Sequence, residues 1–410
     1  MLKRADSFQR RVLFSLCSSV FLFLLQGPTI AKSATYYVSL SGSDANLGTS
    51  TSSQFRTFAR STKALRPGDT LYIRGGVWTQ QLDLMANNTS GTSGSYIKIA
   101  GYPGETVTLR YADPITAGYG PIKARGSRGY LIFENLVLDG INSTNNTGWQ
   151  IPDGNHHFIL RNLEIKNFKF NGLFIGGGSN IQVINCTIHN QISLSGTTGE
   201  RWYGIYFHHG SNGLLQGNKI YSNPGGGIHA YPGPSPNLVI RGNAVYNNNR
   251  LSTSTVGGIL VWGTSSSTIS SPQVYNNLVY RNGTSTSGTA SGIEIGYYVQ
   301  NAKVWNNTVY GNKSYGLRIG HNTTVVNSVV QNNISYANGA GNYVSLGSGT
   351  TYTSNMTTDP KFVDASSSNF QLQSTSPAIN KGVILSNVPI DYKNTPRPRG
   401  TSYDIGGYEY

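Results

Sequence analysis

The chain has little cysteine and little charge. It contains two cysteines in 410 residues, and charged residues make up 12% of the sequence. Cys17 falls in the N-terminal apolar segment, so Cys186 has no internal partner, and a scaffold held together by disulfides is excluded. The hydrophobic content of 37% argues against disorder. Stability must therefore come from a packed apolar core.

Acidic residues are scarce: 17 Asp and Glu stand against 31 Lys and Arg, a net charge of +14. Removing residues 1–34 takes away five basic residues and one acidic residue and leaves about +10. A basic surface favours acidic partners such as uronic acid polymers, sulfated glycans, nucleic acid or an anionic envelope; the plainer interpretation is solubility alone. No cluster of Lys and Arg points to nucleic acid.

The only long apolar run lies near the N-terminus. Four basic residues precede the run over 12–25, and small residues follow it over 31–34, which predicts a secretory signal peptide over 1–34. The cleavage position stays open between Ala31, Ser33 and Ala34. The run is too short to cross a bilayer comfortably, so we expect no membrane span. Leu16 before Cys17 argues against a lipid anchor. The predicted location is extracellular or periplasmic.

Glycine and tyrosine are plentiful, at 50 and 26 residues, and they fall in a repeating unit. The strand-like stretch 292–296 is followed by 305–312, and 316–320 then begins the next unit. Upstream, 227–230, 242–248 and 258–261 follow the same order. A unit of about two dozen residues that alternates apolar and polar positions is typical of a β-solenoid. The sequence therefore predicts an all-β chain built as a solenoid.

The repeats divide the chain. Residues 35–69 hold a short strand and then apolar residues at helical spacing, which predicts an amphipathic helix that covers the first coil. Coils are expected over 70–350. The repeat fades after Tyr343, and we interpret 359–379 as a last irregular coil within a capping segment, 351–410, that runs back over the stack.

Two columns of side chains recur from coil to coil. The first runs through Leu136, Leu163, Cys186, Asn218, Asn243, Asn277, Asn307 and Asn333, and the second through His189, Tyr221, Tyr246, Tyr280, Tyr310 and Tyr336. Stacked asparagines can hydrogen-bond to one another, and stacked tyrosines can pack ring on ring. Both ladders are expected to be structural, with Cys186 a small buried member of the first.

The two ends and the coils together resemble a known family. The segments 36–38, 42–44, 55–57 and 67–72, with the ending 404–409, are similar to secreted right-handed parallel β-helix proteins of the pectate lyase type. The resemblance covers nearly all of the chain after residue 34. It implies a right-handed parallel β-helix with an irregular C-terminal cap, the asparagine ladder between the second and third strands of each coil, and sugar binding in the groove along the first sheet. Lyases, epimerases, hydrolases and uncharacterised proteins share this fold.

Alternation sorts the residues of the Gly-Ile-x-Ile strands into two faces. The inward set is apolar: Leu173, Ile175, Ile205, Phe207, Ile228, Ala230, Ile259, Val261, Ile293, Ile295, Leu317 and Ile319. The outward set carries chemistry: Phe174, Tyr206, His208, His229, Tyr231, Leu260, Trp262, Glu294 and Arg318. We expect His208, His229 and Tyr231 to lie close together, and Glu294 to contact Arg318. The alternative is a solvated sheet face with an ordinary ion pair.

These residues favour β-elimination, by a lyase or an epimerase, on an acidic, uronic-acid-containing polysaccharide. The reaction needs a base, an acid and a cation that stabilises the carboxylate-derived anion. The candidate catalytic residues are His229 and His208 as bases, Tyr206 and Tyr231 as acids, and Arg318 and Arg201 as cations. The candidate substrate-binding residues are Trp262, Glu294, Trp202, Tyr203, Tyr297 and His321. The loops 191–203 and 250–257 are expected to wall the groove.

Other functions fit less well. A glycoside hydrolase needs two carboxylates, and Glu294 lacks a partner unless the loop that carries Glu200 folds over. Zinc at His208, His209 and His229 is disfavoured because neighbouring strand residues point to opposite faces. No cofactor is predicted; calcium has no acidic cluster to bind, although an ion off the strand face stays open. His156, His157 and His189 are taken as structural. The rival class is a non-catalytic glycan-binding or envelope protein. We expect a monomer.

Overall fold

The computed structural model describes residues 33–410 apart from 112–119, 142–146, 193–201, 251–255 and 285–289. These residues form one compact unit. Residues 1–32 of the predicted signal peptide therefore lie outside the described residues. In the part that is described, no helix is long and apolar enough to cross a membrane.

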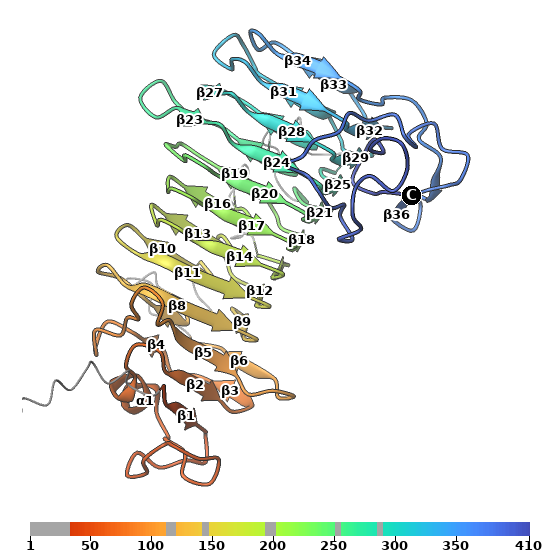
Figure 1. Cartoon of the computed structure of the whole chain (residues 1–410). Coiled ribbons are helices and arrows are strands. Elements are labelled where there is room, and N and C mark those ends of the chain that lie inside the picture. The colour runs from red at the N-terminus through yellow and green to blue at the C-terminus, as the bar shows by residue number, and fades with distance from the viewer. Residues whose placement is uncertain (1–32, 112–119, 142–146, 193–201, 251–255, 285–289) are drawn as a thin grey trace, which may run out of the picture. The chain divides into compact units, whose positions relative to one another are not determined.

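Three parallel sheets account for most of the chain, which is a right-handed parallel β-helix (Figure 1). Each full coil contributes one strand to each sheet in turn. We number the sheets by their order within a coil. Sheet 1 has eight strands: β10 (Trp149–Pro152), β13 (Leu173–Gly176), β16 (Ile205–His208), β19 (Ile228–Ala230), β22 (Ile259–Val261), β26 (Ile293–Ile295), β30 (Tyr315–Ile319) and β33 (Gly341–Ser345).

Sheets 2 and 3 complete the coils. Sheet 2 has twelve strands: β1 (Thr35–Val38), β2 (Thr70–Ile73), β5 (Ile97–Gly101), β8 (Gly129–Glu134), β11 (His156–Arg161), β14 (Gln182–Ile184), β17 (Leu214–Gln216), β20 (Val239–Arg241), β24 (Gln273–Tyr275), β28 (Lys303–Trp305), β31 (Val329–Gln331) and β34 (Thr351–Thr353). Sheet 3 has ten: β3 (Gly76–Trp78), β6 (Val107–Leu109), β9 (Val137–Asp139), β12 (Glu164–Lys166), β15 (Thr187–His189), β18 (Lys219–Tyr221), β21 (Ala244–Tyr246), β25 (Leu278–Tyr280), β29 (Thr308–Tyr310) and β32 (Ile334–Tyr336).

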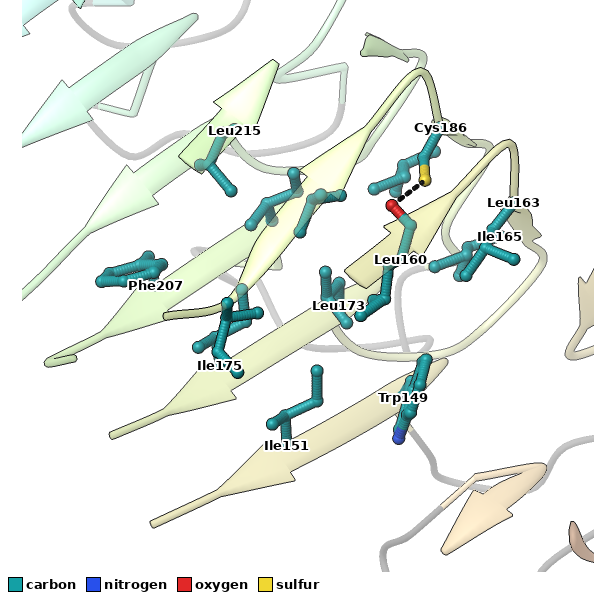
Figure 2. Packing of buried hydrophobic residues seen from close by; sticks show 14 of the residues in the cluster. Trp149, Ile151, Leu160, Leu163, Ile165, Leu173, Ile175, Cys186, Phe207 and Leu215 are labelled. Atoms are coloured by element: carbon teal, nitrogen blue, oxygen red, sulfur yellow. Dashed lines mark hydrogen bonds between the residues drawn. The ribbon is translucent and has the colours of Figure 1, made fainter. Parts of the chain in front are cut away.

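The core lies inside the coils. Every residue of the predicted inward set is fully buried, which confirms the register of sheet 1. Figure 2 shows part of this core, with Trp149, Ile151, Leu173, Ile175 and Phe207 directed into it. Because a one-residue slip would turn this apolar face outward, the core fixes which side chains face solvent.

Cys186 is buried in the first ladder as predicted, and its Sγ lies 3.6 Å from the carbonyl oxygen of Leu160 (Figure 2). The ladder proper begins one coil later. The Nδ2 of Asn218 donates to Oδ1 of Asn243 at 2.9 Å, and the chain of amides continues through Asn277, Asn307, Asn333 and Asn355. It lies between the strands of sheets 2 and 3, as the family resemblance implied.

A second amide ladder was not predicted. It follows the strands of sheet 3 and runs through Asn223, Asn248, Asn282, Asn312 and Asn338, with Nδ2–Oδ1 distances of 2.9–3.0 Å. Both ladders satisfy buried polar groups where the chain turns, which a solenoid needs at every coil.

The tyrosine ladder is only partly continuous. Ring centroids lie 4.8–5.0 Å apart from His189 through Tyr221 and Tyr246 to Tyr280. Phe370 of the C-terminal segment then packs against both Tyr280 and Tyr310, at 4.9 and 5.4 Å.

A helix covers the first coil, and the C-terminal segment packs along the side of the later coils (Figure 1). The helix α1 (Phe58–Ala64) has Thr57 as N-cap and stacks Phe58 on Trp78 at 4.6 Å. The expected last coil over 359–379 is wrong: β35 (Phe362–Asp364) and β36 (Asn369–Leu372) form an antiparallel hairpin. Aromatic packing against the tyrosine ladder, rather than coil pairing, holds this hairpin. Two further pairs of short parallel strands are β4 (Leu82–Asp83) with β7 (Ile122–Lys123), and β23 (Ile269–Ser270) with β27 (Val299–Gln300).

Candidate functional site

The outer face of sheet 1 carries a continuous strip of rings, which we call the aromatic strip. Its members are Phe174, Tyr206, His229, Tyr231, Trp262, Tyr297 and His321. Neighbouring rings in the strip lie 4.7–5.8 Å apart between centroids. Their order follows the parallel register of the strands, for example Tyr206 opposite His229. A row of ring faces along a sheet is a surface on which sugar rings can stack.

The middle of the strip is enclosed. Tyr203, Val256 and Leu260 form a small apolar cluster on the outer face, and Tyr206 and Trp262 pack against it. His229 lies among these rings and is 3% exposed. Its ring centroid is 4.6 Å from that of Tyr203 and 5.3 Å from that of Trp262. Tyr206, Tyr231 and Trp262 remain partly exposed.

His208 lies at the edge of a pocket, which we call the end pocket. It has a volume of about 320 Å³ and is lined by Arg125, Gly126, Gln150, Pro152, Asp153, Phe174, Gly176, His208 and His209. The ring of His208 packs 5.7 Å from Phe174 and 5.7 Å from Tyr206. Burial lowers the pKa of His208, and the neighbouring His209 lowers it further. The imidazole is therefore neutral over more of the pH range than a free histidine, as a base requires.

His209 corrects one expectation. It was assigned to the opposite face from His208, but β16 ends at His208 and His209 has a positive φ of 36°. The chain turns there, so the two rings lie side by side at 4.4 Å. The Nε2 of His209 lies 3.2 Å from Oδ1 of Asp153. The alternation rule assumes that a strand continues, so it cannot predict the direction of a side chain beyond the end of the strand.

A second polar group lies at the other end of the strip. Glu294, 1% exposed, is paired with His321 through its Oε1 and the histidine Nε2. Tyr297 stacks on the His321 ring at 4.7 Å and 9°. The expected ion pair of Glu294 with Arg318 is not formed between these described residues, although their Cα atoms are in register. The guanidinium of Arg318 lies instead over the ring of Tyr315, 5.7 Å from its centroid.

The strand order separates some of the predicted partners. Four strand steps lie between His208 on β16 and Arg318 on β30, which is about 19 Å at about 4.8 Å per step. One sugar residue cannot contact both. Trp202 packs on Phe170, at 4.4 Å. Arg201, Glu200 and most of the two expected groove walls lie outside the described residues.

Three residues of the end pocket, Arg125, Gln150 and Asp153, were not predicted from the sequence. Gln150 lies in a Gly-Trp-Gln-Ile stretch, 148–151, that fits the strand pattern and could have been used, and Asp153 follows two residues after this stretch. Arg125 lies in a stretch without a recognisable repeat, so only the folded chain brings it to His208.

The comparisons place the chain among known proteins. Residues 36–356 match the model of the Pel9A-like, right-handed β-helix region. The chain belongs to this family. The crystal structure of pectate lyase Pel9A is similar with a TM-score of 0.60 and 18% identity, over 92% of this chain and 96% of that one. A rhamnogalacturonan lyase gives 0.60 and 16%, over 84% and 95%.

A hydrolase shares the fold as well. The native GH136 lacto-N-biosidase from Eubacterium ramulus is similar with a TM-score of 0.52 and 14% identity, over 79% of this chain and 68% of that one. No curated protein matches the chain. At these identities the solved structures establish the fold alone.

Calcium does not fit the described residues of this Pel9A-like chain. They contain no group of three or more His, Cys, Asp or Glu that could hold a metal ion. Glu294, the carboxylate on the strands of the aromatic strip, is already paired with His321. Calcium prefers six or more oxygen ligands, several of them carboxylates, and this donor set does not provide them.

Proposed function

We propose that the chain is a polysaccharide lyase that cleaves an acidic, uronic-acid-containing polysaccharide by β-elimination along the outer face of sheet 1. The observation that carries the proposal is the end pocket, where His208 and Arg125 line one concave site beside the aromatic strip. Two lyases that share this fold over most of its length support the reaction class.

Two residues of the end pocket, together with Tyr206, whose ring lies 5.7 Å from that of His208, match the steps of the reaction. Neutral His208 takes the proton from carbon 5 of the uronate, and the negative charge that develops on the sugar carboxylate is stabilised by the Arg125 guanidinium. The electron pair forms a double bond between carbons 4 and 5, the bond to the oxygen on carbon 4 breaks, and Tyr206 protonates that oxygen. The products are a shortened chain and an unsaturated uronide.

The rest of the strip is proposed to bind the polymer. Tyr231, Trp262 and Tyr297 offer ring faces to successive sugars, and Arg318 and His321 meet the carboxylate of a sugar farther along. His229, enclosed beneath Tyr203, supports the floor of the groove. Arg201, Trp202 and Tyr203 stay candidates for the wall of the groove. Export through a signal peptide over 1–34 and a monomeric state also remain proposals.

An absorbance assay tests the function. Pectate, alginate, chondroitin and hyaluronan are each incubated with the protein, with and without a chelator, because the unsaturated uronide absorbs in the ultraviolet. We expect a rising signal on one polymer that His208→Ala abolishes and the structural variant His189→Ala retains. Incorporation of solvent deuterium into the polymer without absorbance would identify an epimerase, which shares only the first proton transfer.

A glycan-binding protein is the second candidate, and the enclosure of His229 favours it. A strip whose central histidine is 3% exposed works as a rigid aromatic platform whether or not a proton is transferred. No absorbance and no deuterium uptake on any polymer, with measurable binding to one, would establish this function instead.

A further inference from the structure

The residue just before the first asparagine ladder has a left-handed backbone in coil after coil. Asparagine occupies this column at Asn185, Asn276, Asn306 and Asn332, with φ between 47° and 57°. Gly217 and Gly242 occupy it in two adjacent coils, with φ of 67° and 63°. Asparagine and glycine both tolerate this conformation, so either residue can occupy the column. The glycines leave two coils without a side chain where their neighbours have one.

The asparagines of this column hold the C-terminal segment onto the coils. The Nδ2 of Asn276 donates to the carbonyl of Ile390 at 2.7 Å, and that of Asn332 donates to the carbonyl of Val383 at 2.8 Å. At the two coils that have glycine in this column, residues 388–394 pass over a cavity of about 350 Å³. We call residues 388–394 the strap and the cavity the strap cavity. Its size falls within the range of small-molecule pockets, about 300–1,000 Å³.

One charged side chain in this cavity is held in place by its neighbours. The Nε of Arg241 donates to Oε1 of Gln216 at 2.8 Å, and its Nη1 donates to the hydroxyl of Tyr275 at 3.0 Å. These three residues are in register on β17, β20 and β24. The contacts fix the plane of the guanidinium and leave Nη2 to bind a ligand, which suits a carboxylate.

The cavity also contains the carboxylate of Asp391, but backbone amides already donate hydrogen bonds to both of its oxygens. Oδ1 of Asp391 accepts from the amides of Lys393 and Thr395, both at 2.7 Å, and Oδ2 accepts from the amide of Glu409 at 3.0 Å. By contrast, Oδ1 of Asn276, a residue that is 4% exposed, has no donor. A buried acceptor without a donor destabilises the fold unless a ligand supplies the donor.

We propose that the strap cavity is a second carbohydrate site, which binds the uronate residue of an acidic saccharide. The sugar carboxylate pairs with Arg241, a sugar hydroxyl donates to Asn276, and Tyr392 of the strap offers a ring. The class of ligand, though not the cavity, rests on the proposed function. Because the cavity lies on sheet 2, away from the outer face of sheet 1, it holds the polymer without taking part in cleavage.

The test measures binding without turnover. Saturation-transfer NMR is run with glucuronate and galacturonate, and with glucose and galactose as neutral probes. All variants are made in an Arg125→Gln/Trp262→Ala background, which removes a cation of the end pocket and a stacking ring of the aromatic strip, so that binding on sheet 1 is suppressed. Arg241→Gln removes the cation. Gly242→Asn fills the cavity with the residue that neighbouring coils carry, and a Cβ at Gly242 would meet nothing nearer than the Gly217 nitrogen at 3.9 Å. Arg161→Gln is the matched control, since Arg161 lies on the same sheet and pairs with Glu134 outside the cavity.

We expect saturation transfer to the uronates and none to the neutral sugars. The transfer to the uronates should be at least tenfold weaker in both cavity variants and unchanged in Arg161→Gln and in His208→Ala. Equal transfer to neutral and acidic sugars, no transfer to either uronate, or transfer that survives both cavity variants would overturn the proposal. Loss in His208→Ala would overturn it too, by placing the sugar in the end pocket. A polymer panel with no elimination product would refute the lyase and leave this result intact.

Discussion

Glu294 and His321 form a hydrogen-bonded pair on the outer face of sheet 1, with the carboxylate side chain 2% exposed and the imidazole 16% exposed. The two residues come from neighbouring coils: Glu294 is on β26, and His321 follows the end of β30. The buried carboxylate holds the more exposed imidazole in one orientation at this end of the aromatic strip.

Removing one member of this pair should cost more stability than removing both. His321→Ala leaves the Glu294 carboxylate buried without its partner, at about 1–3 kcal/mol. Adding Glu294→Gln in the same chain removes that charge and should restore part of the loss. The thermal midpoints of the wild type, both single variants and the double variant form a cycle that measures the coupling. Additive losses would show that the pair contributes nothing to folding.

The end pocket predicts a particular pH dependence of elimination. His208 must be neutral to act, and burial and then His209 lower its pKa below the ordinary 6.5, so the acid limb of the rate profile should lie below pH 6.5. His209→Gln removes the neighbour that lowers the pKa of His208 and should move the limb up. Asp153→Asn removes an anion that raises the pKa and should move the limb down.

Shifts of the acid limb in opposite directions in these two variants would identify His208 as the titrating base, because a general loss of structure would not shift the limb in both directions. His189→Gln, on sheet 3, serves as the control and should leave the profile in place. An acid limb that neither variant moves would exclude His208 as the base.

The repeat pattern was sufficient to predict the fold. Alternation in the Gly-Ile-x-Ile strands assigned Ile293 and Ile295 to the core, and both are fully buried. Apolar burial depends on a period of two residues, which is present in the sequence itself. The same reasoning found the asparagine column from Asn218 onward, because each coil repeats it.

The site could be predicted only in part, since its details depend on features that do not repeat. The end of β16 turns His209 beside His208, and Arg125 reaches the same pocket from an irregular stretch. Distance along the stack also mattered: register predicted that Arg318 and His208 share a face, but four strand steps separate them. Glu294 has several possible partners nearby, and only the folded structure shows that it pairs with His321 rather than with Arg318.

The asparagine ladder should be worth much more than a surface amide. Asn277 is fully buried; it donates to Ile240 and Asn307 and accepts from Asn243. Asn277→Ala leaves several of these groups without partners, and we expect a loss of about 2–4 kcal/mol in the free energy of unfolding. Asn322→Ala, at an exposed position, should cost about 0.5 kcal/mol or less. Chemical denaturation of the two variants makes the comparison, and equal losses would show that the ladder is not stabilising.

Glu134 predicts a loss of stability in acid. Burial would raise its pKa, but hydrogen bonds from Arg161 and Lys98 outweigh that effect, and the pKa lies below the ordinary 4.5. A carboxyl with a lowered folded pKa stabilises the fold fully above the unfolded value and loses that contribution as the pH falls through the folded value. The thermal midpoint of Glu134→Gln should therefore lie below that of the wild type at pH 7, and the two should converge below pH 4.5. A constant difference at every pH would contradict the linkage.

Variants of Trp262 and His208 should distinguish a loss of polymer binding from a loss of catalysis. Trp262 is partly exposed in the aromatic strip and contacts Tyr297 and His321 edge to face. Trp262→Ala removes a stacking surface and should weaken polymer affinity about tenfold, about 1.4 kcal/mol, with a smaller effect on kcat. His208→Ala should do the reverse, because the base acts in the transition state and adds little to ground-state binding. Calorimetric titration and the absorbance assay on the same polymer measure both quantities. If His208→Ala weakens binding as much as Trp262→Ala does, and no variant changes a turnover rate, the strip is a binding platform and the end pocket is part of it.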